Sequence, residues 1–335
     1  MNTFPVQAST LSALELGNFL KEKYHLNEDY QCKLFRTGLN HTYFLEYENK
    51  KFVARVYCHN WRTKNEIKEE LQLLKLLKDQ GLGVSYGIAD KNGAYIQEIE
   101  APEGLRYITL FSFAKGKKIR SMSNKTCVAI GSVMAKMHQI TINKRIDRVQ
   151  YNSEILINTS YENLKLYFTE DLPVMKLLKK IGNELTKTLA QIPETSFPNG
   201  IVHLDIWYDN LNINDENEIT LFDFDNCGNG VLILDVAYFC IQLFFIENNK
   251  EVYELKLDHF LKGYNKKREL YSDEINLIPS YAASIFIFYL GVQAKRFDWS
   301  NIFLTENYLN MFVGRINTWL EYYKTKELNC IKQPQ

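Results

Sequence analysis

The spacing of apolar residues changes near residue 113, and this change sets the expected fold class. Before that point, short β-branched or aromatic segments alternate with turn residues, which is typical of strands. Beyond it, apolar residues recur at helical spacing over most of the chain. Strands grouped around one early helix, followed by a helical remainder, predict an α+β protein with a small antiparallel β-sheet domain and a larger, mainly helical domain.

Individual segments support this division. One helix is expected over 10–24 and a second over Lys64–Gln80, where apolar residues share one face and Gly81 ends the pattern. A hairpin with a polar turn is expected inside the helical half, between Leu211–Ile213 and Glu218–Asp223. The strands expected in the first third are Cys32–Phe35, Thr42–Tyr47, Lys51–Tyr57, Ala94–Glu98 and Tyr107–Phe113.

Composition narrows the class of protein. The 335 residues exceed the ~250–300 at which one hydrophobic core stops growing, so one large or two unequal domains are expected. Forty basic and forty acidic residues balance, which argues against nucleic acid as a partner. The six cysteines form no CxxC pair, as is usual for reduced thiols. With apolar runs below the ~20 residues of a membrane span and no secretory signal pattern, a cytoplasmic protein without membrane partners is expected.

The segment 201–230 carries the residues suited to chemistry. It contains the pattern HxDx4N with Asp205 and Asn210, then the expected hairpin, then DFD beginning at Asp223. Phosphoryl transfer needs an oxygen that accepts the proton of the attacking hydroxyl, and hard oxygen ligands for Mg²⁺. Asp205 is the candidate base, and Asn210 and Asp223 flank the hairpin as candidate metal ligands. The alternative is an ordinary loop and hairpin whose acidic residues are merely solvated.

These motifs resemble the catalytic core of the aminoglycoside phosphotransferase/choline kinase family, whose members carry H-G-D-x4-N followed by I-D-[FW]-[DE]. Weaker landmarks at 52–57, 66–77, 108–116 and 130–140 extend the resemblance over nearly the whole chain. The resemblance implies a protein-kinase-like two-lobe fold with the nucleotide in the cleft between the lobes. It also implies ATP-dependent phosphorylation of a small-molecule hydroxyl, with GTP not excluded as the donor.

The same resemblance assigns roles to the central residues. Asp205 corresponds to the catalytic base, and Asn210 and Asp223 to the residues that hold Mg²⁺. Arg55 stands where a Lys or Arg contacts the nucleotide phosphates, and Glu70 where the acidic partner of that cation is expected. Arginine is permanently charged and offers a two-pronged fork for phosphate oxygens, so it can take the place of the commoner lysine.

Two loops are expected to complete the nucleotide site. Gly38 and Asn40 lie in a turn whose backbone amides can cradle phosphates, although the turn has only one glycine. The landmark at 108–116 resembles the hinge that receives the adenine through backbone groups. The expected hinge contacts are Ser112, Phe113 and Ala114, and the expected boundaries are a nucleotide-binding lobe at 1–111, the hinge at 112–116 and a helical lobe with the acceptor site at 117–335.

Four further residues surround the catalytic motif. His203 is expected to brace the loop, because Asp205 already supplies the proton acceptor. Leu204 stands where the family usually has glycine, a departure that leaves the acidic residues intact. Asp235 lies in an apolar helix, and the resemblance implies that it holds the catalytic loop. For Asp225 two roles stay open: it adds to metal binding, or it only finishes the strand.

The acceptor contacts are the least specific part of the pattern. Tyr208 and Asp209 follow the candidate base, and Asp298 and Trp299 lie among late aromatic residues, which more often form core than pocket. Aromatic faces with carboxylates suit an amine-bearing acceptor through cation–π contact and charge pairing. Two other functions stay open: a kinase acting on Ser or Thr of proteins, and a catalytically silent nucleotide-binding module. The sequence does not set the oligomeric state.

Overall fold

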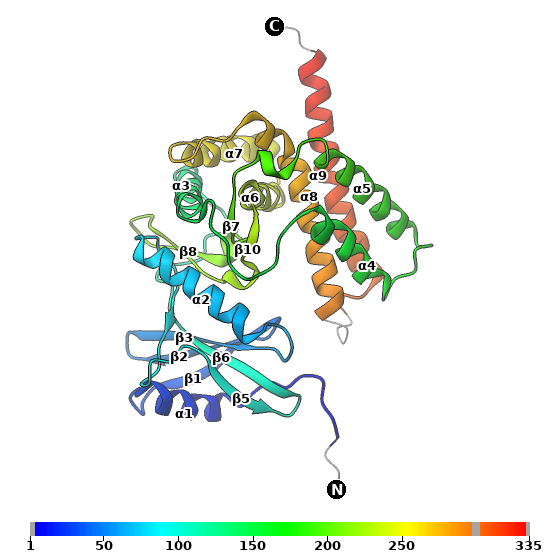
Figure 1. Ribbon diagram of the computed structural model, residues 1–335. Coiled ribbons are helices and arrows are strands. Elements are labelled where there is room, and N and C mark those ends of the chain that lie inside the picture. Colours follow the sequence, from blue (N-terminus) through cyan, green and yellow to red (C-terminus); the bar gives the residue numbers. More distant parts are fainter. Residues whose placement is uncertain (1–3, 297–301, 333–335) are drawn as a thin grey trace. The chain divides into compact units, whose positions relative to one another are not determined.

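The computed structural model describes residues 4–296 and 302–332 (Figure 1). The chain divides into two compact units. Unit 1 comprises Met1–Lys117, Asn212–Asn214 and Thr220–Asp223, and unit 2 comprises Lys118–Leu211, Asp215–Ile219 and Phe224–Gln335. Two short pieces of the later chain therefore fold with the first 117 residues.

Unit 1 is built on an antiparallel sheet with the strand order β1-β2-β3-β6-β4, and β5 also pairs with β6. Two helices accompany it; in Figure 1, α1 lies on one side of these strands and α2 on the other. The elements are α1 (Ala13–Tyr24), β1 (Gln31–Arg36), β2 (Asn40–Tyr47), β3 (Lys50–Tyr57), α2 (Lys64–Asp79), β4 (Gly87–Ile88), β5 (Gln97–Ala101) and β6 (Gly104–Ser112).

Alternation along β3 separates core residues from a charged one. Ala54 and Val56 are fully buried and join a core with Leu16 and Leu20 of α1. Because successive side chains of a strand point to opposite faces, Arg55 lies on the other face of the sheet. The sequence pattern of β3 therefore directs one arginine away from the α1 core.

Helix α2 has well-defined ends. Thr63 Oγ1 accepts from the Glu66 amide at 3.2 Å, and Glu66 Oε2 accepts from the Thr63 amide at 2.8 Å, which completes a capping box. Gly81 follows the helix with φ of 70°, a left-handed conformation that glycine adopts without a Cβ penalty. The helix expected over Lys64–Gln80 is confirmed and ends one residue earlier, at Asp79.

Unit 2 is mainly helical. Its helix α6 is buried throughout Ile233–Ile241, and the Phe239 ring stacks on Phe260 of α7 with centroids 4.2 Å apart. The α-helices described in this unit are α3 (Asn124–Thr141), α4 (Ser160–Lys165), α5 (Pro173–Leu189), α6 (Ile233–Ile246), α7 (Lys250–Asn265), α8 (Ser272–Arg296) and α9 (Glu306–Lys332). The shorter turns are the π-helical η1 (Glu154–Thr159) and the 3-10 turns η2 (Glu194–Ser196), η3 (Tyr208–Asn210) and η4 (Phe224–Asn226).

Helices α3 and α7 approach each other backbone to backbone. A Cβ built on Gly131 would lie 2.1 Å from Phe260 O, and one built on Gly263 would lie 2.1 Å from Val128 O. Only glycine permits this approach. The close packing fixes the position of α3. This helix carries His138, whose ring contacts Asp235 of α6.

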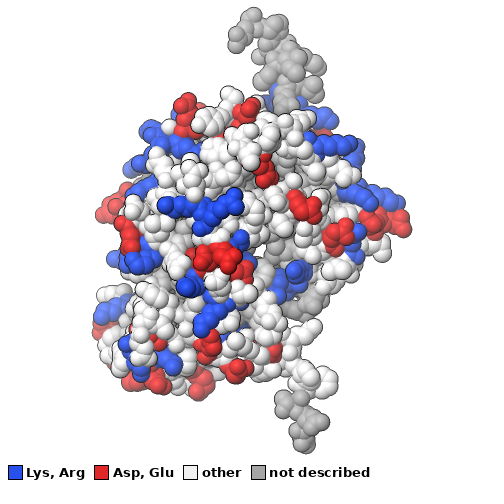
Figure 2. All heavy atoms as spheres, in the orientation of Figure 1, with Lys and Arg blue, Asp and Glu red and all other residues white. Residues whose placement is uncertain are grey.

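Helix α8 is apolar over much of its length. Among the described helices it is long and apolar enough to cross a membrane by length and composition, yet 72% of its most apolar 18-residue window is buried within the protein. This degree of burial is that of a core helix. On the surface of the molecule, Figure 2 shows basic and acidic side chains interspersed over the visible face.

The structure bears on two further strand pairs and on one expected strand. The hairpin expected near 211–223 is confirmed as β8 (Leu211–Ile213) with β9 (Ile219–Leu221). The pair β7 (Asn199–Val202) and β10 (Gly228–Val231) was not expected, because four-residue, glycine-containing strands carry no alternation signal. The strand expected at Ala94–Glu98 lies later, at β5, since Asp90 bonds the Ala94 amide and closes a turn there.

These observations confirm the α+β class, with a small antiparallel sheet unit and a larger helical unit. Hydrogen bonds explain why hairpin residues count with unit 1. Leu221 N donates to Gly83 O at 2.9 Å, and Lys117 N donates to Ile213 O at 2.9 Å. The hairpin strands thus bond to both ends of the 83–117 stretch.

Candidate active site

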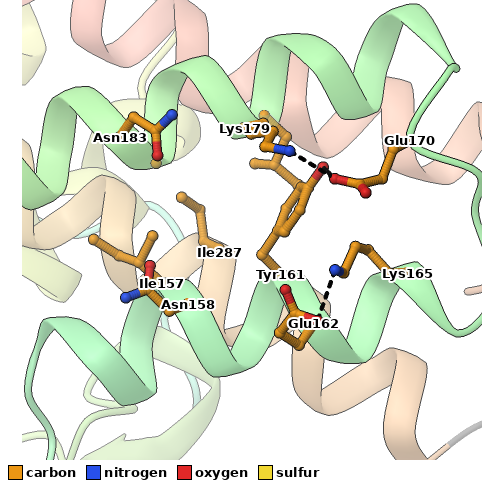
Figure 3. A pocket seen from close by; sticks show the side chains of 11 residues that line it. Ile157, Asn158, Tyr161, Glu162, Lys165, Glu170, Lys179, Asn183 and Ile287 are labelled. Carbon is orange, nitrogen blue, oxygen red and sulfur yellow. Dashed lines mark hydrogen bonds and ion pairs between the residues drawn. The ribbon is translucent and has the colours of Figure 1, made fainter.

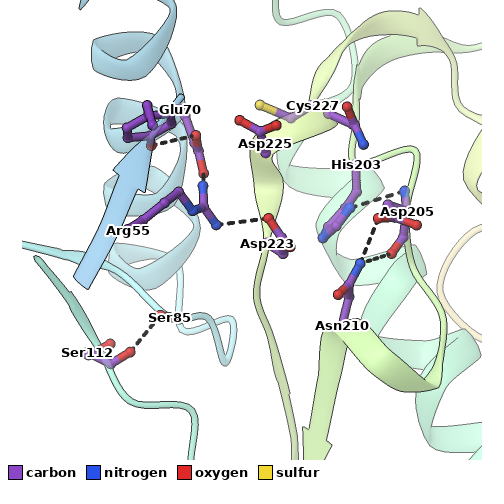
Figure 4. A network of polar contacts seen from close by, with 12 residues as sticks. Arg55, Glu70, Ser85, Ser112, His203, Asp205, Asn210, Asp223, Asp225 and Cys227 are labelled. Atoms are coloured by element: carbon purple, nitrogen blue, oxygen red, sulfur yellow. Dashed lines mark hydrogen bonds and ion pairs between the residues drawn. The ribbon is translucent and has the colours of Figure 1, made fainter. Parts of the chain in front are cut away.

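A charged triad lies within unit 1. Arg55 Nη1 donates to Glu70 Oε1 at 2.7 Å, and Arg55 Nη2 donates to Asp223 Oδ1 at 2.9 Å (Figure 4). The Glu70 side chain is 1% exposed, whereas that of Asp223 is 31% exposed. The guanidinium is therefore anchored on a buried carboxylate and reaches toward a more accessible one.

Further contacts fix the geometry of this triad. Tyr57 Oη donates to Glu70 Oε2 at 3.4 Å, and the Arg55 guanidinium lies 4.9 Å from the centroid of the Phe111 ring. A carboxylate buried with its hydrogen bonds satisfied tolerates burial because its charge is paired. The arrangement can present the rigid, singly charged fork of a guanidinium to an anion.

Asp223 occupies a special backbone position. Its φ is 64°, in the left-handed region, two residues after the end of β9 and directly before η4. Asparagine and aspartate tolerate this conformation better than bulky residues do. The turn changes the direction of the chain at the residue whose carboxylate meets Arg55.

The expected phosphate turn lies between β1 and β2. A Cβ built on Gly38 would meet only Asn40 O, at 3.7 Å, so the fold itself does not require glycine there. Gly38 O accepts from Cys58 Sγ at 3.4 Å, and Asn40 Oδ1 is buried with no hydrogen-bond partner among the described residues. A glycine without a packing reason, next to an unsatisfied buried oxygen, suits a loop that takes a ligand.

The expected hinge residues are partly engaged inside unit 1. The Ser112 amide donates to Tyr86 O at 2.9 Å, and Ser112 O accepts from Ser85 Oγ at 2.6 Å. Ala114 O accepts from Asn212 Nδ2 at 2.6 Å. A backbone contact to a nucleotide base would therefore come from Phe113 and the Ala114 amide rather than equally from all three residues.

In unit 2, Asp205 and Asn210 are joined directly. Asn210 Nδ2 donates to Asp205 Oδ2 at 2.7 Å and to Asp205 O at 3.1 Å, and Asn210 is 4% exposed (Figure 4). The Asp205 amide donates to His203 Nδ1 at 3.2 Å. Because its Nδ2 binds Asp205, the Asn210 amide directs Oδ1 away from that carboxylate.

Two tyrosines that sequence reasoning missed also contact Asp205. The hydroxyls of Tyr238 on α6 and Tyr289 on α8 hydrogen-bond to its carboxylate. Burial, and next the Asp205 charge, hold the pKa of each tyrosine well above its ordinary value, so both remain protonated donors. Tyr289 Oη also lies 3.2 Å from Leu204 O. Asp205 is thus held by side chains from three separate segments.

Asp235 organises the backbone of the catalytic segment. It is fully buried, and its carboxylate accepts from the His203 amide at 2.9 Å and from the Leu204 amide at 2.6 Å. His138 Nε2, on α3, lies 3.0 Å from the same carboxylate, and Tyr264 Oη lies 2.6 Å from His138 Nδ1. The carboxylate accepts only, so Nε2 carries the proton and Nδ1 accepts from the tyrosine.

Leu204, which stands where the family usually has glycine, has a positive φ. Leu204 has φ of 66°, the left-handed region in which a glycine is unstrained, and its side chain is fully buried. The strain costs roughly 1–2 kcal/mol for a residue with a Cβ. Burial of a leucine side chain returns about as much, roughly 1.5–3 kcal/mol.

The expected acceptor residues divide into two sets. Asp209 Oδ1 accepts from Lys118 Nζ at 2.6 Å, and the Arg120 guanidinium lies 5.9 Å from the centroid of the Tyr208 ring. The Asp209 carboxylate is therefore already paired with a cation within unit 2. Asp298 and Trp299 lie outside the described residues.

Asp225 lies just beyond the triad residue Asp223 in the sequence, but in unit 2. It is 4% exposed, and its carbonyl oxygen accepts from Arg148. Arg148 Nη1 also lies 3.3 Å from Cys227 Sγ. The segment after Asp223 is thus tied down by an arginine from the loop that follows α3.

Asn210 and Asp223, the predicted magnesium ligands, carry oxygens of the type that Mg²⁺ takes, and their role stays a prediction. Among the described residues, no three acidic, histidine or cysteine side chains are grouped as a metal site. Mg²⁺ commonly takes only one or two protein oxygens and completes its shell with substrate phosphates and water. Asn210 Oδ1 and the Asp223 carboxylate are hard oxygen donors of that kind.

Comparison with known proteins places this geometry in a family. The model of the phosphotransferase enzyme family matches residues 32–270, which include the triad, Asp205 and Asn210. The chain belongs to the phosphotransferase enzyme family. This confirms the resemblance noted from the motifs, and with it the kinase-like fold class of this phosphotransferase.

Three similar proteins illustrate the relationship. A homoserine kinase of Bradyrhizobium diazoefficiens is 24% identical over 293 residues, covering 87% of this chain and 86% of its own. An amicoumacin kinase solved in complex with AMP-PNP, Ca²⁺ and Ami has a TM-score of 0.77 at 20% identity and covers 93% of this chain and 94% of its own. A microcompartment-associated aminopropanol kinase has a TM-score of 0.74 at 18% identity and covers 93% and 98%. The two structures show that this phosphotransferase shares their fold over nearly its whole length.

Proposed function

We propose that this phosphotransferase moves the γ-phosphoryl group of ATP to a hydroxyl of an amine-bearing small molecule. The observation that carries the proposal is Arg55, which bonds both Glu70 and Asp223 across 15 and 168 residues of sequence. Two carboxylates from separate segments fix the orientation of this guanidinium, whose planar fork suits phosphate oxygens. The family match supplies the reaction class.

Asp205 is the proposed base. The acceptor hydroxyl donates its hydrogen bond to this carboxylate, and its oxygen forms a bond to the γ-phosphorus as the bond to the bridging oxygen breaks. The hydroxyl proton passes to Asp205 and then to water, and ADP leaves with the bonding electron pair. Asn210, Tyr238 and Tyr289 hold the carboxylate so that one oxygen edge faces the acceptor.

The triad is proposed to bind the phosphates of the nucleotide. Arg55 contacts phosphate oxygens with its fork and Glu70 orients it, because Glu70 is buried and bonded to the same guanidinium. Asn210 Oδ1 and Asp223 would hold Mg²⁺, which neutralises charge on the transferred group when bound. Gly38, Asn40, Phe113 and Ala114 are the proposed remaining nucleotide contacts.

The proposed class of acceptor is supported by the names of the proteins that this chain resembles. The names homoserine, aminopropanol and aminoglycoside each denote a compound with both a hydroxyl and an amine. Because Asp209 is already paired with Lys118, the amine contact is expected from other groups near Asp205, such as the aromatic rings of α8. An amine next to the reacting hydroxyl is the shared chemistry.

An acceptor panel tests the proposal. ADP release with Mg²⁺ and ATP is measured for matched pairs such as 1-amino-2-propanol with 1,2-propanediol, and an aminoglycoside with a neutral disaccharide. The amine member of each pair is expected to show a kcat/KM roughly tenfold higher, the size of one charge-assisted hydrogen bond. A consistent preference for neutral compounds contradicts the acceptor class. Transfer to serine-containing peptides, or Mg²⁺-ATP binding without any turnover, contradicts the proposed reaction.

A further inference from the structure

A groove of about 730 Å³ runs along the outer side of α2 in unit 1. One wall is the helix itself, and the other is formed by the chain around β4 and by the residues that precede β5. Lys64, Lys68, Leu71, Lys75 and Lys78 line it from the helix. These residues are spaced by three, four or seven positions, so they share one helical face.

The groove carries an excess of positive charge. Its lining contains four lysines and one acidic residue, Asp79. Lys75 pairs with Asp79 at 2.5 Å, and Lys64 pairs with Glu98 at 2.8 Å, both in solvent. Lys68 is exposed and makes no hydrogen bond or ion pair with the described residues. Exposed pairs of this kind are weak and exchange readily for another anion.

The cations are arranged in two pairs around an apolar centre. Lys64 and Lys68 lie toward the start of α2, Lys75 and Lys78 toward its end, and Leu71 lies between them. At 1.5 Å per residue the row spans about 21 Å. Tyr95, 42% exposed, adds an aromatic surface to the floor. Leu71 is only 8% exposed, so the apolar surface of the groove comes mainly from Tyr95, with positive charge on both sides.

A second pocket, in unit 2, gives the contrast (Figure 3). It measures about 240 Å³ and also contains lysines, but each has a carboxylate beside it. Lys179 lies 2.9 Å from Glu170, and Lys165 lies 2.7 Å from Glu162. Two lysines against two glutamates leave no net charge there. A basic excess is thus a property of the α2 groove and not of every pocket in the protein.

We propose that the α2 groove docks an acidic peptide segment of a partner protein, with an apolar residue seated on Tyr95 beside the exposed edge of Leu71 and acidic residues at both ends. An extended peptide of seven residues is about 23 Å long, which matches the row of lysines. A single small anion would meet only one of the two lysine pairs. The row also contains Asp79, and its centre is a leucine, so a polyanion of uniform charge fits it less well than an acidic–apolar–acidic segment.

The groove does not depend on the proposed catalytic function. Glu70 belongs to the buried residues of α2, with Ile67 and Leu74, whereas the four groove lysines are exposed. None of the groove lysines belongs to the triad or to the expected nucleotide contacts. Binding at the groove is therefore tested without measuring phosphoryl transfer.

The test uses fluorescence anisotropy with the full-length chain. The probe is a fluorescein-labelled peptide with two glutamates, serine, phenylalanine, serine and two glutamates. It is expected to bind, and binding should weaken as ionic strength rises from about 0.05 to 0.5 M because exposed charges are screened. Lys68→Glu should weaken binding roughly fivefold, and adding Lys78→Glu should weaken it further.

Control variants and probes decide the outcome. Lys50→Glu makes the same charge change at an exposed site of unit 1 outside the groove, and should alter binding less than about twofold. A probe with lysines in place of the glutamates should not bind, and one with serine in place of phenylalanine should bind more weakly. The proposal is overturned if the acidic probe does not bind at roughly 1 mM. Equal effects of Lys68→Glu and Lys50→Glu, or tighter binding of an RNA oligomer or anionic vesicles, would overturn it as well.

Discussion

In unit 1, Arg55 takes its two partners from segments 15 and 168 residues away, whereas in unit 2 Asp205 takes Asn210 from five residues along the same loop. The first set is held by ion pairs between side chains. The second is held largely by neutral donors: an amide and two tyrosine hydroxyls. The proposed binding of phosphates and the proposed acceptance of a proton thus rest on two different kinds of support.

The Arg55 contacts and the Asp205 contacts also differ in the buried carboxylate that supports each of them. Under the triad, Glu70 accepts from Arg55 and Tyr57, so the buried charge is balanced by a neighbouring cation. Under the catalytic loop, Asp235 accepts from two backbone amides and His138. Loss of a side chain should therefore disturb ligand binding in unit 1 but folding of the loop in unit 2.

Removal of Asp235 is expected to have the largest effect on stability. Asp235→Ala leaves the His203 and Leu204 amides and His138 Nε2 buried without their acceptor, and should lower the free energy of unfolding by about 3 kcal/mol. Urea unfolding measures the change. Asp258→Ala, which removes an exposed acid paired with Lys262, is the control and should cost less than about 1 kcal/mol. Equal losses would refute the role of Asp235.

Replacement of Arg55 should separate binding of the phosphates of ATP from binding of its adenosine part. Arg55→Ala is expected to weaken ATP roughly tenfold to a hundredfold and adenosine only slightly, because only the phosphates lose a charged partner. Arg55→Lys should recover part of the loss, since it keeps the charge but not the fork. Calorimetric titration with both ligands checks this. A parallel weakening of ATP and adenosine would instead indicate general damage to β3.

Tyr289 tests whether neutral donors position the base. Tyr289→Phe removes one hydroxyl that contacts Asp205, and should lower kcat roughly fivefold, the value of one hydrogen bond, while leaving KM for ATP unchanged. Tyr281→Phe, a buried tyrosine on the same helix, is the control and should leave kcat unchanged. If both variants change kcat alike, or if KM for ATP rises instead, Tyr289 does not position Asp205.

His41 gives the smallest expected effect and concerns pH. Burial, and next the nearby Arg106, lower the pKa of His41 below its usual 6.5. The unfolded chain therefore binds this proton more readily than the folded one, so stability should fall as pH drops below about 6.5. Urea midpoints at pH 7.5 and 5.5 should differ less in His41→Leu than in the original chain. An unchanged difference would mean that other groups set the acid sensitivity.

The sequence could predict the parts of the site that are local. Asp205 and Asn210 are close in sequence, and Asp223 follows a hairpin, so their spacing alone suggested a common task. Arg55 and Glu70 were expected from a family landmark, and their contact lies within one small unit. Short-range geometry and strand alternation suffice for such residues.

Other parts depend on packing that no local pattern encodes. Tyr238 and Tyr289 lie on apolar helices, where aromatic residues at helical spacing favour core, and only the folded α6 and α8 bring their hydroxyls to Asp205. The Ser112 backbone is engaged by the 85–86 segment, a contact between residues that no periodicity links. Likewise, the short pair β7 and β10 forms between segments 26 residues apart with little side-chain pattern.

The central claim is that Asp205 acts on the acceptor and not on the nucleotide. The most direct measurement is single-turnover transfer of γ-labelled phosphate to the best amine-bearing acceptor by Asp205→Asn, together with the Kd for Mg²⁺-ATP. The account predicts transfer roughly 10²–10⁴-fold slower than in the original chain, with a nearly unchanged Kd, because a general base is lost while the nucleotide contacts remain. Transfer within a few-fold of the original rate would contradict it.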